Sequence, residues 1–184
     1  MRRRLACAVL MFLFLVATAC SSSDSASTGD GQQSASATPT NAQISLPDGW
    51  AMQDAISAEE VAAVTGQTMT YFPEAGSSAQ AGKPSCGYTV AGKDDSKILF
   101  SADVSGGSGP FEAMKDYAVE GTIQSVDGLG DAAYTCAFAG GRRGIIVLKG
   151  NALVRVDWSS TAYTVDTEEF GTALAGKLLA NLFR

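Results

Sequence analysis

The first 43 residues constrain this chain most, because an apolar run and a segment rich in Ser, Ala and Thr leave the folded core to residues 44–184. Arg2, Arg3 and Arg4 precede a largely apolar run from Leu5 to Ala19. A positively charged start, an apolar stretch and small residues at its end are typical of an export signal. The run has 15 residues, fewer than the ~20 that a membrane-spanning helix needs. The sequence therefore predicts a signal peptide over residues 1–19.

Cys20 determines how the exported chain is expected to be held. It follows the apolar run directly and precedes three serines, where a thiol has no structural role in a flexible segment. Val16-Ala17-Thr18-Ala19-Cys20 resembles the lipobox of bacterial lipoproteins, although Ala17 stands where that motif usually has Leu or Val. In that motif the cysteine receives a diacylglycerol before cleavage, and two acyl chains are enough for stable anchoring. We expect lipidation of Cys20 and a location on the outer face of the plasma membrane.

Two alternatives to this interpretation stay open at the level of sequence. The apolar run could be an uncleaved membrane anchor, which its length disfavours. It could also be an ordinary secretory signal cut after Ala17-Thr18-Ala19, because small residues occupy both ends of that triplet.

Residues 20–43 are predicted to be a disordered tether. After Cys20 they are rich in Ser, Ala, Thr, Gly and Gln, with no aliphatic residue larger than Ala. Such a segment cannot bury enough apolar surface to offset the entropy of ordering it. Large apolar side chains begin at Ile44, so we expect one globular domain over residues 44–184.

Charge and composition exclude several function classes. The whole chain has a net charge of −6, and loss of the three arginines would leave the mature chain near −9. This balance argues against nucleic acid as a partner. The chain contains no histidine, which excludes histidine-based catalytic triads and most zinc and transition-metal sites. We therefore predict no catalytic residues, no cofactor, no metal ligands and no enzymatic activity.

The periodicity of apolar residues in the domain predicts an α+β fold. Helical spacing and capping patterns predict helices over 57–65, over 110–119 and from Asp166 to the C-terminal end. Alternating apolar residues predict strands between and after the first two helices, at 69–72, 85–90, 98–104, 122–126, 132–138, 144–149 and 152–159. We expect a single domain with an antiparallel β-sheet and helices packed on one of its faces.

Cys86 and Cys136 are predicted to form a disulfide. They are the two cysteines left once Cys7, in the signal peptide, and Cys20 are assigned, and an exported compartment is oxidising. Each lies on the apolar side of its predicted strand. Closing a loop of about 50 residues would stabilise the domain by roughly 4 kcal/mol. The alternative is two separate buried thiols.

Three polar motifs are candidate sites, and each also has a structural explanation. Asp127-Gly-Leu-Gly-Asp131 could hold a calcium ion, but its spacing matches no EF-hand loop and Asp is common in turns. Arg142-Arg143 could meet an anion or a phosphate, although charges in an exposed hairpin are ordinary solubility devices. Gly106 to Pro110 faintly resembles a nucleophile elbow without the required second glycine or any histidine.

The domain resembles the small envelope lipoproteins of Actinobacteria that are grouped in domain-of-unknown-function families. The resemblance covers roughly residues 54–182 and rests on the segment Glu59 to Gly66, a Cys86-Gly-Tyr88 strand, Leu129-Gly-Asp-Ala-Ala133 and the closing helix. Several such proteins pair the equivalent of Cys86 with a cysteine just before the first helix. Here Asp54-Ala-Ile56 contains none, so Cys136 is the partner that remains.

This resemblance implies a lipid-anchored envelope domain that binds something, and it supplies no activity. We expect a non-catalytic binding, sensory or adaptor module whose partner is an envelope protein or a small ligand. The alternative is a carrier of an apolar, lipid-like ligand in a pocket between sheet and helices.

Overall fold

The computed structural model describes residues 43–47, 49–73, 83–159 and 167–184, without the side chains of 167 and 168. The predicted signal peptide, Cys20 and the tether up to residue 42 lie outside the described residues. Residues Pro39–Arg184 form one compact unit, and both apolar cores described below are built entirely from it. No helix in the described part of this unit is both long and apolar enough to span a membrane.

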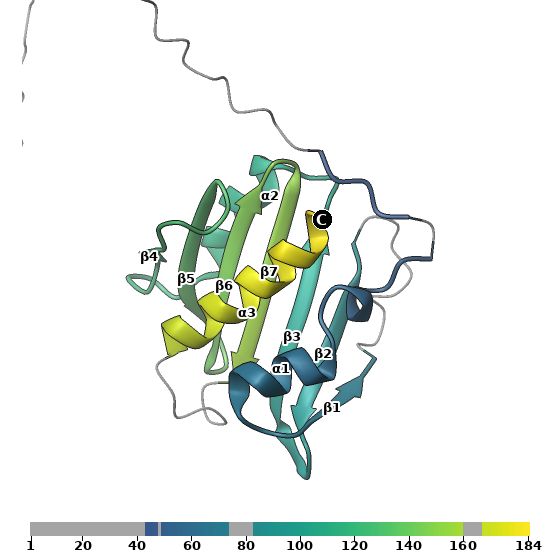
Figure 1. Ribbon diagram of the computed structural model, residues 1–184. Helices are drawn as coiled ribbons and strands as arrows, with labels where there is room; N and C mark the ends of the chain where they lie inside the picture. Colours follow the sequence, from purple (N-terminus) through teal and green to yellow (C-terminus); the bar gives the residue numbers. More distant parts are fainter. Residues whose placement is uncertain (1–42, 48, 74–82, 160–166) are drawn as a thin grey trace, which may run out of the picture. The chain divides into compact units, whose positions relative to one another are not determined.

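Seven strands of the described chain form one fully antiparallel sheet in the order β1-β2-β3-β7-β6-β5-β4 (Figure 1). Their bounds are β1 Met69–Phe72, β2 Ser85–Val90, β3 Lys93–Asp103, β4 Gln124–Ser125, β5 Ala132–Phe138, β6 Arg142–Lys149 and β7 Ala152–Ser159. Because β7 pairs with β3 on one side and β6 on the other, the last strand of the chain is the central strand of the sheet.

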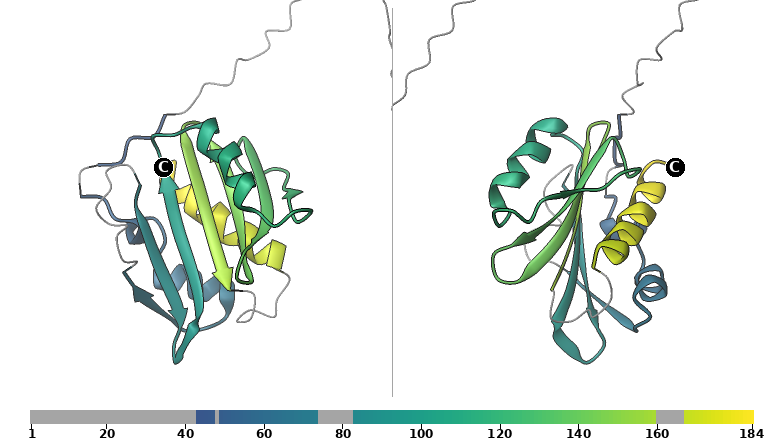
Figure 2. Two further views of the ribbon diagram at one scale, coloured as in Figure 1. Left: turned by 180° about the vertical axis from the view of Figure 1, so that it is seen from behind. Right: turned by 90° about the vertical axis from the view of Figure 1, so that its left-hand side faces the viewer.

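The helices lie on both faces of this sheet. The α-helices are α1 Ala58–Thr65, α2 Ser108–Ala113 and α3 Thr167–Leu182, with 3₁₀ turns η1 Met52–Asp54 and η2 Met114–Tyr117. Seen edge-on, α1 and α3 cover one face, and α2 lies on the other (Figure 2, right). The predicted class, an antiparallel α+β domain, is confirmed. The expectation that the helices share one face is correct for α1 and α3 and wrong for α2.

Each face of the sheet has its own apolar core. The larger core joins α1, α3 and the inward residues of β1, β2, β3, β6 and β7; its fully buried members include Ile56, Val61, Ile98, Phe100, Ile145, Val156, Leu174 and Leu178. The smaller core lies under α2 and contains Phe111, Tyr134, Cys136, Phe138, Ile146 and Leu153. β6 and β7 supply residues to both cores, because successive residues of a strand point to opposite faces.

The first helix forms where its capping residues predict. The Ser57 hydroxyl accepts a hydrogen bond from the Glu60 backbone N–H at 3.2 Å, and the Glu60 carboxylate accepts one from the Ser57 N–H at 2.9 Å. This reciprocal arrangement satisfies two backbone donors that the helix start would otherwise leave unpaired. The helix ends at Gly66, whose φ of 67° is a left-handed conformation that glycine adopts without strain. The helix predicted over 57–65 from its capping pattern is confirmed.

Gly171 lets α3 approach the sheet closely. A Cβ atom at Gly171 would lie 2.5 Å from the Trp158 ring, whereas one at Gly176, a turn further along, would meet nothing closer than Leu129 at 3.9 Å. Trp158 packs edge-to-face with Phe170, with their ring centroids 5.6 Å apart. The glycine therefore sets the distance between the helix and the central strand.

These two glycines give a matched test of the packing. We expect Gly171→Ala to lower the free energy of unfolding by about 1–3 kcal/mol, because the added methyl group overpacks the Trp158 contact. Gly176→Ala should be neutral or stabilising by up to ~1 kcal/mol, because alanine favours the helix and its methyl group has room. Urea unfolding of residues 39–184 measures both. Equal effects of the two substitutions would contradict this packing of α3.

Candidate functional site

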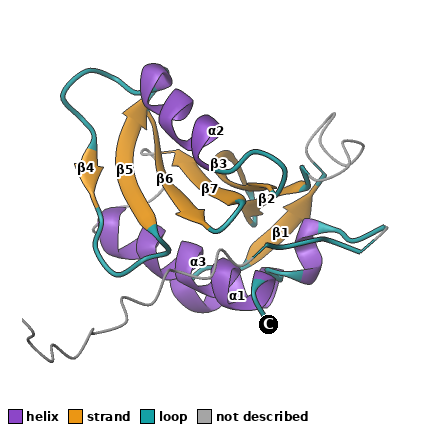
Figure 3. Ribbon diagram, turned by 90° about the horizontal axis from the view of Figure 1, so that it is seen from above, coloured by secondary structure: helices purple, strands orange, loops and turns teal. Residues whose placement is uncertain are grey.

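Of the described helices, only α2 lies on its face of the sheet, and it covers only part of that face (Figure 2). Seen from behind, α2 lies over the β5–β6 side, and no helix crosses in front of β2 and β3 (Figure 2, left). Viewed from above, α2 again sits toward one end of the sheet, opposite α1 and α3 (Figure 3). A cleft of about 410 Å³ opens on this side of the sheet; its lining residues are Lys83, Ser85, Leu99, Ser101, Ala102, Asp103, Met114, Arg142, Leu153, Arg155 and Asp157.

An ion pair on the central strand forms the middle of the cleft. Arg155 and Asp157 are two residues apart on β7, so their side chains lie on the same face. Arg155 Nε donates to Asp157 Oδ1 at 2.8 Å, and Nη2 contacts Asp157 Oδ2, which makes the pair bidentate. The side chain of Asp157 is 6% exposed and that of Arg155 is 25% exposed. Removing both charges from water costs energy that their attraction offsets only with good geometry.

Neighbouring residues shape the space around this pair. Gly144 lies opposite Asp157 on β6, and a Cβ atom there would come within 2.5 Å of Asp157 Oδ1 and 2.8 Å of the Phe138 ring. Glycine therefore makes room for the carboxylate. The guanidinium carbon of Arg155 lies 4.6 Å from the centre of the Phe138 ring, a cation–π distance. Arg155 is thus fixed by a carboxylate at one edge and by an aromatic ring on one face.

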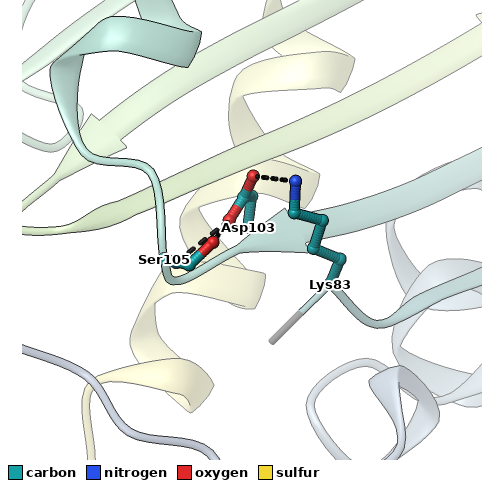
Figure 4. Close-up of polar contacts among 3 residues, drawn as sticks. All are labelled: Lys83, Asp103 and Ser105. Atoms are coloured by element: carbon teal, nitrogen blue, oxygen red, sulfur yellow. Dashed lines mark hydrogen bonds and ion pairs between the residues drawn. The ribbon is translucent and has the colours of Figure 1, made fainter. Parts of the chain in front are cut away.

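A second ion pair marks one end of the cleft. Lys83 Nζ lies 3.0 Å from Asp103 Oδ2, and the other Asp103 oxygen accepts hydrogen bonds from the Ser105 hydroxyl at 2.7 Å and its N–H at 3.0 Å (Figure 4). Burial opposes the ionisation of Asp103, but the Ser105 hydrogen bonds and the Lys83 ammonium together lower its pKa below the ordinary value. Asp103 is therefore an ionised acceptor at neutral pH.

The other sequence motifs have structural roles or separate positions. Asp131 accepts a hydrogen bond from the Gly150 N–H at 2.7 Å and so fastens the β6–β7 hairpin, and no cluster of metal-ligating side chains occurs within the described ranges. Arg142 lines the cleft. Arg143 is the cross-strand neighbour of Trp158 and so lies on the other face of the sheet. Trp158, Tyr134 and Phe138 are core residues.

Cys86 and Cys136 are buried but not bonded to each other, so the structure contradicts the predicted disulfide. Strand register places Cys86, Phe100, Val156, Ile145 and Thr135 in one cross-strand row, so Cys136, the next residue, points to the opposite face. Four strand spacings of ~4.8 Å separate β2 from β5, far more than the ~7 Å between Cα atoms that a disulfide can bridge. Burial, followed by the nearby Asp157 carboxylate, raises the pKa of the Cys136 thiol to about 11.

Sequence reasoning did not identify Arg155, Asp157, Lys83 or Asp103 as site residues. The available signal was the segment Val154 to Trp158, in which two opposite charges alternate with large apolar residues. Such a pattern ordinarily indicates a strand with one face in water. Only the placement of β7 at the centre of the sheet turns that polar face into a partly buried site.

A comparison with known proteins adds no assignment to this site: the chain matches no protein-family model, no curated protein and no solved structure.

The Arg155–Asp157 pair yields a stability prediction that separates a structural from a functional role. We expect Arg155→Met to lower the free energy of unfolding by about 3 kcal/mol, because it leaves the Asp157 carboxylate buried without its guanidinium. The double variant Arg155→Met, Asp157→Leu should recover most of that loss, since apolar side chains commonly replace such a pair at little cost. Thermal and urea unfolding test this. A double variant no more stable than the single one would mean that the fold itself requires the pair.

Proposed function

We propose that this chain is an exported, lipid-anchored and non-catalytic binding module, and that its ligand site is the cleft over β2, β3 and β7. The observation that carries the proposal is the bidentate Arg155–Asp157 pair in the uncovered half of the sheet face. A fold that needed only stability would be served as well by apolar residues at these positions. A cleft that combines apolar walls with a few fixed polar groups is the usual form of a small-ligand site.

The arrangement of charges supports binding rather than catalysis. Paired-carboxylate hydrolysis requires two carboxyl groups ~5–10 Å apart, one of them with a raised pKa. Asp103 and Asp157 both line the cleft, but β3–β7 register sets them four residues apart along the strands, or ~13 Å. Each is paired with a cation, and the pKa of Asp103 is lowered. These features suit fixed recognition groups.

The alternative, a carrier of an apolar ligand between sheet and helices, gains no support from the packing. Ile56, Val61, Ile98, Phe100, Leu174 and Leu178 fill the space between the sheet and α1 and α3, and each is 0% exposed. A second described cleft, of about 360 Å³, is lined by residues of α1 and the start of β1 and lies at the edge of that layer. The larger cleft is on the opposite face.

The anchor is tested by substitution of Cys20. In the organism's own membranes or a bacterial host that lipidates exported proteins, Cys20→Ala should move the full-length protein from the membrane fraction to the soluble fraction, because stable attachment needs the acyl chains. Ser21→Ala, next to it, should leave the distribution unchanged. Retention of the Cys20→Ala protein in the membrane fraction would rule out lipidation of Cys20 as the anchor and favour an uncleaved helix.

The binding role is tested by a ligand screen on ¹⁵N-labelled residues 39–184. A set of small acids, amines, neutral sugars and fatty acids should include compounds that shift the backbone amide signals of Ser85, Ser101 and Arg155 in a saturable way. Shifts centred on Phe170 and Leu178 with fatty acids would favour the carrier instead. If no compound class shifts either group of signals, the small-ligand role of the cleft is wrong.

A further inference from the structure

We propose that the cleft recognises an oxyanion, a carboxylate or phosphate group on a small ligand, and that Arg155 is its principal contact. This inference rests on the proposed binding function and specifies the chemistry of the ligand. Three features of the cleft support it: the available edge of the Arg155 guanidinium, a row of hydroxyl groups beside it, and the local balance of charge.

Arg155 is oriented with one hydrogen-bonding edge still available. A guanidinium has five N–H donors in a rigid planar fork. Asp157 occupies the edge formed by Nε and Nη2, and the Phe138 ring lies against one face. No residue of the described ranges hydrogen-bonds to the edge formed by Nη1 and Nη2, and a quarter of the side chain is exposed in the cleft. Carboxylate and phosphate oxygens match such an edge in a bidentate manner.

Two serine hydroxyls continue from Arg155 across the sheet. Ser101 is the direct cross-strand partner of Arg155 on β3, and Ser85 is the partner of Ser101 on β2. Side chains in such positions lie about 5 Å apart on one face. Ser85 Oγ is buried and has no hydrogen-bond partner in the described part of the protein. A buried hydroxyl without a partner is unfavourable, and an oxyanion oxygen is an acceptor that would satisfy it.

The charge of the cleft is opposite in sign to that of the chain. Lys83, Arg142 and Arg155 line it together with Asp103 and Asp157, which leaves one excess positive charge. The chain as a whole carries −6. A locally positive, partly enclosed cleft attracts small anions, while the acidic remainder repels large polyanions. The combination selects for a small anionic ligand or a single anionic group.

The test follows the side-chain Nε–H signal of Arg155 in ¹⁵N-labelled residues 39–184. Sodium acetate and inorganic phosphate are titrated separately, with chloride holding the ionic strength constant. We expect a saturable shift of this signal and of the Ser85 and Ser101 amides with at least one anion. Acetate binding more tightly indicates a carboxylate ligand, and phosphate binding more tightly indicates a phosphorylated one. Saturation with neither anion overturns the inference.

Three variants assign the binding to this edge of Arg155. Arg155→Gln should weaken anion binding at least tenfold, and Arg143→Gln, on the opposite face of the sheet, should leave it unchanged. Because Arg155→Gln also disturbs the pair with Asp157, Ser101→Asp provides a second variant, in which a carboxylate beside Arg155 should compete for the free edge and abolish binding. Undiminished binding in Ser101→Asp would overturn the inference.

The outcome is separable from that of the proposed function. If neutral or cationic compounds shift the cleft signals while acetate and phosphate do not, the cleft is a binding site and its anion preference is refuted. If no compound shifts them, the binding function itself fails.

Discussion

Everything in this domain depends on the position of β7, the last strand in sequence and the middle strand in space. A central strand has a neighbour on each side, and here a helix layer covers one face while a shorter helix partly covers the other. Val154, Val156 and Trp158 enter the larger core, and Leu153 enters the smaller one. The side chains at the outward positions Arg155 and Asp157 are only 25% and 6% exposed, whereas charges on an edge strand can be fully solvated. The bidentate pair offsets the cost of removing these two charges from water, because each group supplies an opposite charge and hydrogen bonds to the other.

The strands, the capped first helix and the amphipathic last helix could be predicted from sequence because each is encoded locally. Alternation in Cys86, Tyr88 and Val90 is sufficient to identify β2, and Ser57 with Glu60 is sufficient to begin α1. Alternation does not reveal which face of the sheet an apolar row occupies. Both cysteines were correctly predicted to be buried, but in a sheet with two cores buried residues can be on opposite sides. The disulfide prediction was wrong for that reason.

The site could not be predicted from local sequence patterns, because its residues come from segments far apart in the chain. Asp103 and Lys83 come from the end of β3 and the residues before β2, and Arg142 begins β6, so only the strand order brings them to one cleft. The length of α2 matters equally. The expected helix over 110–119 is an α-helix only to Ala113, followed by a 3₁₀ turn that ends at Tyr117. A longer amphipathic helix could have covered the whole face. The short one packs on Tyr134 and Phe138 and leaves β2 and β3 open.

The part of this face formed by β2 and β3 carries polar side chains, which disfavour association with another apolar surface. Exposed apolar sheet faces are liable to associate with one another, and Ser101, Lys97 and Asp103 on β3 prevent a continuous apolar surface. Lys97 further covers the Phe72 ring at 5.4 Å. Solubility alone would be served by any mixture of exposed charges, such as Lys93, Asp94 and Asp95 at the start of β3. In the cleft the charged groups are instead held by specific partners, Arg155 by Asp157 and Phe138, and Asp103 by Ser105 and Lys83. Holding long side chains in one conformation costs conformational entropy when the protein folds. A ligand that binds to these ordered side chains loses less binding free energy, because they need not be ordered again.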